Sequence, residues 1–104
     1  MNLSKMDCEI SEFSTVVTVS DQVSSDLGGE AVILNMKTGI YHGLNEVGAK
    51  IWDLIEQPKT VKEIHNLIVE EYEVEPEVCK NDLLSLLKNL QSVGLIEVKN
   101  ETAA

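Results

Sequence analysis

The side chains that could support catalysis are few and stand far apart in the sequence. His42 and His65 are the only histidines, and neither has a nucleophile or base beside it at the spacing of a catalytic pair. Gly28-Gly29 fits a tight turn between two extended runs better than a phosphate-binding loop. These residue types predict a protein that is not an enzyme and that uses no cofactor.

A metal site or a carrier function has equally little support. Metal binding would need Cys8, Cys79 and both histidines to converge from four separate elements, with no CxxC spacing among them. Ser85 lies between leucines in mid-helix, whereas the serine of a phosphopantetheine carrier stands at a helix start. We therefore expect no metal, and free thiols in a reducing compartment.

The charge pattern argues against nucleic acid as a partner. The net charge is −10, from 8 basic and 18 acidic residues, and the chain contains no arginine. Residues 1–30 carry one lysine against six acids, and residues 60–75 carry one against five. Such a body repels phosphate and lacks the side chain that most often reads bases. A winged-helix DNA-binding protein or transcription regulator remains the alternative, on the fold class alone.

The 104 residues are expected to form a single domain. Residues 1–13 and 100–104 lack periodicity, which predicts a disordered tail, a folded domain over 14–99 and a frayed end. No apolar run approaches the roughly 18 residues of a membrane span, and no basic region precedes an apolar run at the N-terminus. The expected location is the cytoplasm, without membrane contact.

The first half of the chain has strand patterns and the second half has helix patterns. Extended runs are expected at 14–20, 22–27, 30–36 and 40–44, with a short further strand at 94–98. Three helices follow the first strands: one capped by Asn45, one opened by a capping box of Thr60 and Glu63, and one from Pro76 to Gly94. This order predicts an α+β fold resembling a winged helix-turn-helix, with a small antiparallel sheet of three strands, or four, and three helices.

Two features favour a peptide partner. The strand 40–44 is the last of its series, so one of its edges is expected to be unpaired, and it runs directly into a helix whose Gly48 permits close packing. The third helix is apolar on more than one face, and a second apolar face needs a surface to cover it. An extended peptide could join the edge as a strand. The alternative is that both features belong only to the core.

Two segments, residues 28–55 and 60–98, resemble the PqqD-like family, also called RiPP recognition elements. The points of similarity form an ordered set: G-E-x-V-x-L-N, Lys37-Thr38-Gly39, Tyr41 with Leu44-Asn45, Val47-Gly48, Ile51-Trp52, T-x-x-E-I, Tyr72 with Val74, and Gly94-Leu95-Ile96. Together they cover about residues 15–98. The resemblance implies a winged-helix-like fold without catalysis.

The resemblance also implies a partner. Members of the family bind the leader segment of a ribosomally made precursor peptide and present it to a maturation enzyme, such as a leader peptidase, a cyclase or a radical enzyme. The length of this chain is similar to that of the discrete members, as in lasso-peptide or pyrroloquinoline quinone biosynthesis.

The family's binding mode, carried onto this sequence, places the leader as a strand beside the third strand and against the third helix. The edge strand is Gly39, Ile40, Tyr41, His42, Gly43 and Leu44. The helix wall is drawn from Val78, Cys79, Asp82, Leu83, Leu86 and Leu87, and which leucines face the groove stays open. Because alternate residues of a strand point their backbone groups outward, either Ile40 and His42 or Tyr41 and Gly43 would serve the peptide.

Overall fold

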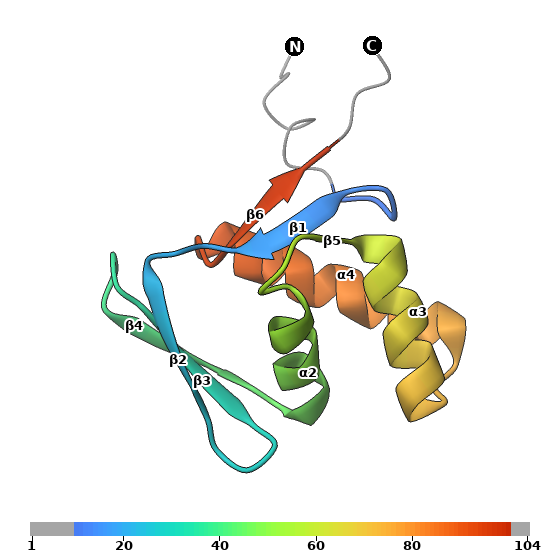
Figure 1. The fold of residues 1–104 in the computed structure, drawn as a ribbon, viewed down its shortest axis with the longest axis horizontal. Helices are drawn as coiled ribbons and strands as arrows, with labels where there is room; N and C mark the ends of the chain where they lie inside the picture. The colour runs from blue at the N-terminus through green and yellow to red at the C-terminus, as the bar shows by residue number, and fades with distance from the viewer. Residues whose placement is uncertain (1–9, 101–104) are drawn as a thin grey trace.

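The computed structural model describes residues 10–100 and has an α+β fold (Figure 1). In chain order its elements are β1 (Thr15–Thr18), β2 (Gln22–Asp26), β3 (Ala31–Asn35), β4 (Ile40–Leu44), α2 (Glu46–Leu54), β5 (Lys59–Thr60), α3 (Val61–Tyr72), α4 (Pro76–Ser92) and β6 (Ile96–Lys99). The predicted fold class, the four early strands, the three helices and the short final strand are all confirmed.

The strands form two sheets where the sequence suggested one. The orders are β2-β3-β4 and β5-β1-β6, and every pairing is antiparallel. β1 does not pair with β2, because β5 and β6 already pair with its two edges. Just after β1, the amide of Val19 donates to the carbonyl of Leu95. This bond ties the chain to the connection between α4 and β6 before β2 begins.

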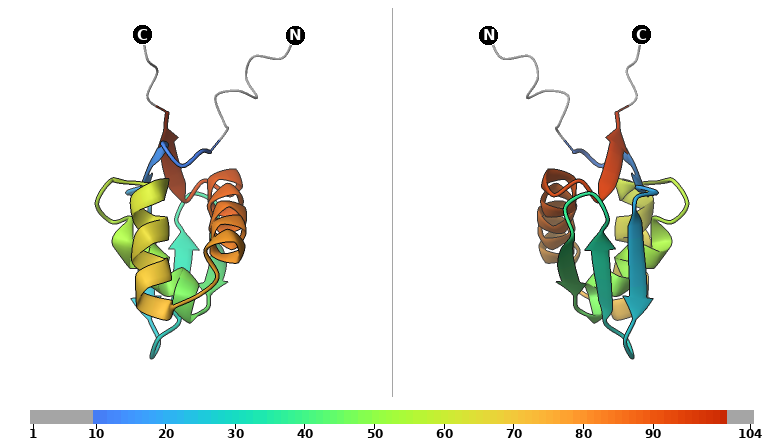
Figure 2. Two further views of the ribbon diagram at one scale, coloured as in Figure 1. Left: turned by 90° about the vertical axis from the view of Figure 1, so that its right-hand side faces the viewer. Right: turned by 90° about the vertical axis from the view of Figure 1, so that its left-hand side faces the viewer.

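The hairpin of β2 and β3 turns at Gly28-Gly29, as expected. Both glycines have positive φ, 71° and 98°, and the amide of Leu27 donates to the carbonyl of Glu30 at 2.7 Å. Figure 2 shows the three strands of this sheet on one side of the molecule, with the helices behind them. Ala31, Ile33 and Asn35 are buried on the helix side, so this sheet has one covered and one open face.

Local signals set the ends of the helices as predicted. Thr60 and Glu63 form a complete capping box, and Pro76 is the first residue of α4. α4 ends in a Schellman motif: Gly94 has φ 78°, and the amide of Leu95 donates to the carbonyl of Leu90 at 2.9 Å. The core lies between the helices and the two sheets, and its largest buried side chains are Trp52, Ile33, Ile55, Ile64, Ile68, Leu83, Leu87, Leu90 and Leu95.

The folded part begins before residue 14, where the sequence placed the boundary. Ile10 is only 8% exposed and joins the core, and the amide of Lys62 donates to the carbonyl of Glu12 at 2.9 Å. The hydroxyl of Ser14 donates to the side chain of Asn100, which links the two ends of the described chain. Periodicity cannot reveal so short an anchor. The rest of the expected tail and end, residues 1–9 and 101–104, lies outside the described residues.

Candidate functional site

One edge of the β2-β3-β4 sheet is formed by β4, which pairs with β3 and with no other described strand. Two bonds next to the β2–β3 ladder show which backbone groups remain free on β4. The carbonyl of Glu30 and the amide of Met36 both bond to the β2 side, so even-numbered residues of β3 face β2. Odd-numbered residues of β3 therefore face β4, and their partners there are Ile40, His42 and Leu44.

The backbone groups of Tyr41 and Gly43 consequently point away from β3, off the free edge. Of the two pairs that the sequence left open, Tyr41 and Gly43 are therefore the pair with outward backbone groups, whereas His42 uses its backbone groups within the sheet. The side chain of Leu44 packs on the core, so His42 and Ile40, two and four residues earlier, lie on the same helix-facing side. Tyr41, 68% exposed, lies on the open face of the sheet.

A groove of about 460 Å³ runs between β4 and the helices. It is lined by Gly43, Leu44, Asn45, Val47, Gly48, Ile51, Ile68, Tyr72, Val74, Val78, Cys79, Asp82, Leu83 and Leu86. These residues come from β4, α2, α3, α4 and the connections between them, and most are apolar. A groove with apolar walls beside an unpaired strand can take an extended chain, whose backbone would bond to the strand.

Two parallel rows of side chains from α4 form one wall of the groove. Cys79 and Leu83 form the inner row, at 8% and 2% exposure. Val78, Asp82 and Leu86 form the outer row, four residues apart and open to solvent to different degrees. The inner row continues into the core, and the outer row forms the lip of the groove.

The structure brings together seven of the residues proposed from the sequence: Gly43, Leu44, Val78, Cys79, Asp82, Leu83 and Leu86. Gly39, Ile40, Tyr41 and His42 lie at the start of the same edge, outside the groove lining. Leu87 does not reach the groove: it is fully buried in the core. It lies one residue past Leu86, and about 100° around a helix is enough to turn a side chain from the groove to the core.

Residues of α2 and α3 complete the groove, and the sequence did not assign them to it. They are Val47, Gly48 and Ile51 of α2, Ile68 and Tyr72 of α3, and Val74 after α3. Ile51 and Ile68 are buried at the floor of the groove, whereas Val47 is 36% exposed. The sequence did offer one signal for this part of the groove: Val47 is an apolar residue in the first turn of a helix that directly follows an edge strand.

The corner between β4 and α2 is only one residue long. The side chain of Asn45 accepts the amide of Gly48 at 2.9 Å and caps α2. A Cβ on Gly48 would meet the Cβ of Leu44 at 3.2 Å, so glycine lets the helix start close against the strand. The corner thus joins the edge strand to one wall of the groove without a loop that could move.

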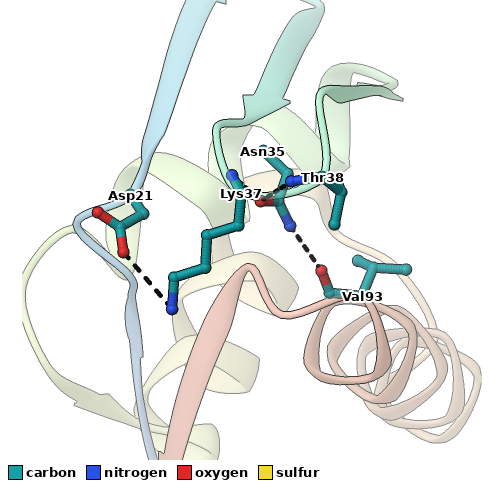
Figure 3. A network of polar contacts seen from close by, with 5 residues as sticks. All are labelled: Asp21, Asn35, Lys37, Thr38 and Val93. Carbon is teal, nitrogen blue, oxygen red and sulfur yellow. Dashed lines mark hydrogen bonds and ion pairs between the residues drawn. The ribbon is translucent and has the colours of Figure 1, made fainter.

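Asn35 fixes the other end of β4 (Figure 3). Its side chain is buried, and its amide group donates to the carbonyl of Val93 at 2.8 Å. Its oxygen accepts the amides of Lys37 at 2.9 Å and Thr38 at 3.3 Å, which shapes the turn into β4. The turn is thereby tied to the end of α4. Because Val78 to Leu86 lie near the far end of β4, the strand and α4 run in opposite directions along the groove.

The groove is apolar and electronegative. Burial, and to a smaller extent the Asp82 carboxylate, raises the pKa of the Cys79 thiol, which therefore stays neutral at pH 7. Desolvation, and then the carboxylates of Glu71 and Glu46, raises the pKa of Tyr72. Lys50 pairs with Glu71 at 3.4 Å. None of the described residues that line the groove is cationic.

The candidates for chemistry do not assemble in the part of the chain that the structure describes. Within residues 10–100, no three His, Cys, Asp or Glu side chains are grouped so that they could hold a metal ion. His65 bonds through Nε2 to the carbonyl of Pro76 at 2.8 Å, which ties α3 to the start of α4. Cys8 lies outside the described residues. The described helices include none with the length and apolarity needed to span a membrane.

Comparisons with known proteins agree with this arrangement. The model of the PqqD family, described as coenzyme PQQ synthesis protein D, matches residues 30–96. TbiB1, solved in complex with the TbiA(beta) leader peptide, is similar to this chain with 36% identity and a TM-score of 0.73, over 78% of this chain and 94% of that one. No curated protein sequence matches.

A second solved structure shares the fold. It is the PqqD truncation of Methylobacterium extorquens PqqCD, described as a functional, stand-alone RiPP recognition element. It has a TM-score of 0.73 and 16% identity, over 88% of this chain and 97% of that chain. Since the family model spans most of the chain and the similarity to TbiB1 spans more, the chain belongs to the PqqD-like family, the RiPP recognition elements.

Proposed function

We propose that this protein binds the leader segment of a ribosomally made precursor peptide and presents it to a maturation enzyme, without catalysing a reaction itself. The observation that carries the proposal is the free edge of β4, with the outward backbone groups of Tyr41 and Gly43 beside an apolar groove. Family membership and the leader peptide bound to TbiB1 support it.

In the proposed complex the leader lies as an additional strand against β4. Its backbone bonds to Tyr41 and Gly43, and alternate side chains point into the groove toward Leu44 and the α4 wall. Backbone bonding gives an affinity that depends little on sequence, and the groove gives the selection. The maturation enzyme then meets a leader that is held extended. Precursors of this kind are made on ribosomes, so the proposed location is the cytoplasm.

The alternative of DNA binding has no observation in its favour. In a winged helix the third helix would read the major groove. Here the outer row of α4 presents Val78, Asp82 and Leu86, which are two apolar groups and an anion. Random duplex DNA at physiological salt should not be retained, because no basic stripe is available to release counterions. A salt-sensitive shift at micromolar protein would contradict this.

The proposal is tested with the TbiA(beta) leader peptide and with a display library of random peptides. Calorimetry should give a dissociation constant in the micromolar range or below for the leader or for peptides selected from the library. Scrambled peptides of the same composition are the control. Amide exchange then locates the peptide: Tyr41 and Gly43 should slow on binding, while Ser24 and Asp26 of β2 stay unchanged.

Two outcomes would overturn the proposal. One is that neither the TbiA(beta) leader nor any library peptide binds the folded protein. The other is that bound peptides leave the exchange of Tyr41 and Gly43 unaltered, since strand addition must cover these amides.

A further inference from the structure

The outer row of α4 has the spacing of side chains on a strand. Val78, Asp82 and Leu86 are separated by four residues each, which is about 6.0 Å per step along a helix. Alternate side chains on one face of a strand are about 6.6–6.8 Å apart. A peptide strand lying along the groove therefore meets the three side chains in succession with alternate residues, with a mismatch of under about 1 Å per step.

The middle member of this row, Asp82, is an anion that forms no salt bridge with any described residue. No lysine stands three or four residues from Asp82 on α4, where Val78, Cys79, Ser85 and Leu86 lie. Within residues 10–100, the only salt bridges are Lys37 with Asp21 and Lys50 with Glu71. Because its neighbours along the wall are apolar, a bound peptide would exclude water and strengthen the field of this carboxylate.

We infer that the groove selects a five-residue leader segment with apolar side chains at its first and fifth positions and lysine or arginine at its third. The second and fourth positions can be any residue, and the cation at the third position lies against Asp82. The inference rests on the proposed function and specifies its substrate class. The pattern is the same read in either direction, so it holds for both orientations of the leader strand. Apolar ends of the pattern face Val78 and Leu86, and the net charge of −10 favours approach of a cation.

The test is a selection of random twelve-residue peptides on four proteins: wild type, Asp82→Asn, Asp82→Lys and Asp53→Lys. Asp53 is an exposed residue of α2 that does not line the groove, so Asp53→Lys matches the change of net charge caused by Asp82→Lys. Thermal melting checks that all four are folded. Peptides are kept only if they slow the exchange of Tyr41 and Gly43.

Wild type and Asp53→Lys should both enrich a basic residue between two apolar positions. Asp82→Asn should lose the preference at the central position, and Asp82→Lys should prefer aspartate or glutamate there. For one selected peptide, replacing the central lysine by glutamate should weaken binding to wild type about tenfold and strengthen binding to Asp82→Lys.

Two results would overturn the inference while leaving the proposed function intact. In the first, peptides protect Tyr41 and Gly43 but show no charge preference at the centre. In the second, Asp82→Lys keeps the preference of wild type. If no peptide protects these amides on any of the four proteins, the proposed function itself is wrong, and this result is distinct from both of the others.

Discussion

Among the described residues, the β2-β3-β4 sheet has two unpaired edges, β2 and β4, and the groove lies beside β4. By the same alternation that leaves Tyr41 and Gly43 free on β4, β2 leaves Gln22, Ser24 and Asp26 with outward backbone groups. Both edges thus offer hydrogen bonds to an extended chain. The groove takes its lining from β4 and the helices, and no residue of β2 contributes to it.

The difference shows that unpaired backbone groups alone do not make a binding site. A ladder bond contributes a net stabilisation of about 0.5–1.5 kcal/mol, and water competes for it equally on both edges. What β4 adds is a wall: α4 lies beyond its edge, antiparallel to the strand, and supplies apolar surface for the incoming side chains (Figure 2). On β2 the polar side chains of Ser24, Ser25 and Asp26 are exposed.

The largest expected effects come from two adjacent leucines of α4: Leu86 lines the groove, and Leu87 lies in the core behind it. Leu87→Ala should lower the free energy of unfolding by about 2–5 kcal/mol, because Leu87 is fully buried. Leu86→Ala should lower the free energy of unfolding much less, because Leu86 is only partly buried against the core, and should weaken binding of the TbiA(beta) leader about 5–30-fold. Urea unfolding measures the loss of stability for each substitution, and calorimetry measures the loss of leader binding. Equal destabilisation by both substitutions would assign Leu86 to the core.

Proline compares the two edges directly. Gly43→Pro removes an outward amide of β4, and Ser24→Pro removes one of β2. The first should weaken leader binding about tenfold, from one lost bond and local distortion, and the second should have no effect. Gly43→Ala is the control for the side chain, because a Cβ there meets no atom within 4 Å. Equal losses from the prolines at 43 and 24 would remove the distinction between the edges.

The two strands also end differently, and this gives a smaller effect. β2 runs into a glycine turn, whereas β4 runs into a helix that Asn45 caps through the amide of Gly48. Asn45→Ala should cost about 1 kcal/mol of stability, and Asn45→Ser should recover most of it. Thermal unfolding measures both. If Asn45→Ala and Asn45→Ser lose the same amount, the cap does not hold the end of β4.

Charge outside the groove should have the smallest effect. Two versions of one selected peptide, with lysines or glutamates added beyond the bound segment, should differ in association rate about two- to threefold at low salt. The lysine version should associate faster, because the protein carries a net charge of −10. Stopped-flow fluorescence at rising salt should show the difference fading. A difference that persists at 1 M salt would point to a contact with the groove instead.

Sequence reasoning went furthest where the signal is local. Asn45, the pair of Thr60 and Glu63, Pro76 and Gly94 marked the ends of the helices because each cap satisfies backbone groups within one turn. It could not assign β1 to β5 and β6, since that pairing depends on residues more than forty positions away. A run of β-branched residues predicts a strand but does not indicate which other strand it pairs with.

The site was predictable as a strand and a helix, but not as a surface. α4 is apolar around much of its circumference, so the pattern has no phase that would separate Leu86 from Leu87. The contributions of Val47 and Tyr72 depend on how α2 and α3 are tilted against β4, which is a matter of packing. The direction of the backbone groups of His42 followed only from the register with β3.

The pairing of β1 with β6 has a consequence for how the domain can be used. Thr15 faces Lys99 in that ladder, so the chain enters and leaves the fold at neighbouring points. Figure 1 shows this ladder at the opposite end of the molecule from the corner between β4 and α2. A second polypeptide joined before β1 or after β6 would be attached at this end of the fold, away from the corner beside the groove. The domain should therefore be portable: fused to an unrelated enzyme, it would recruit substrates that carry a matching peptide tag.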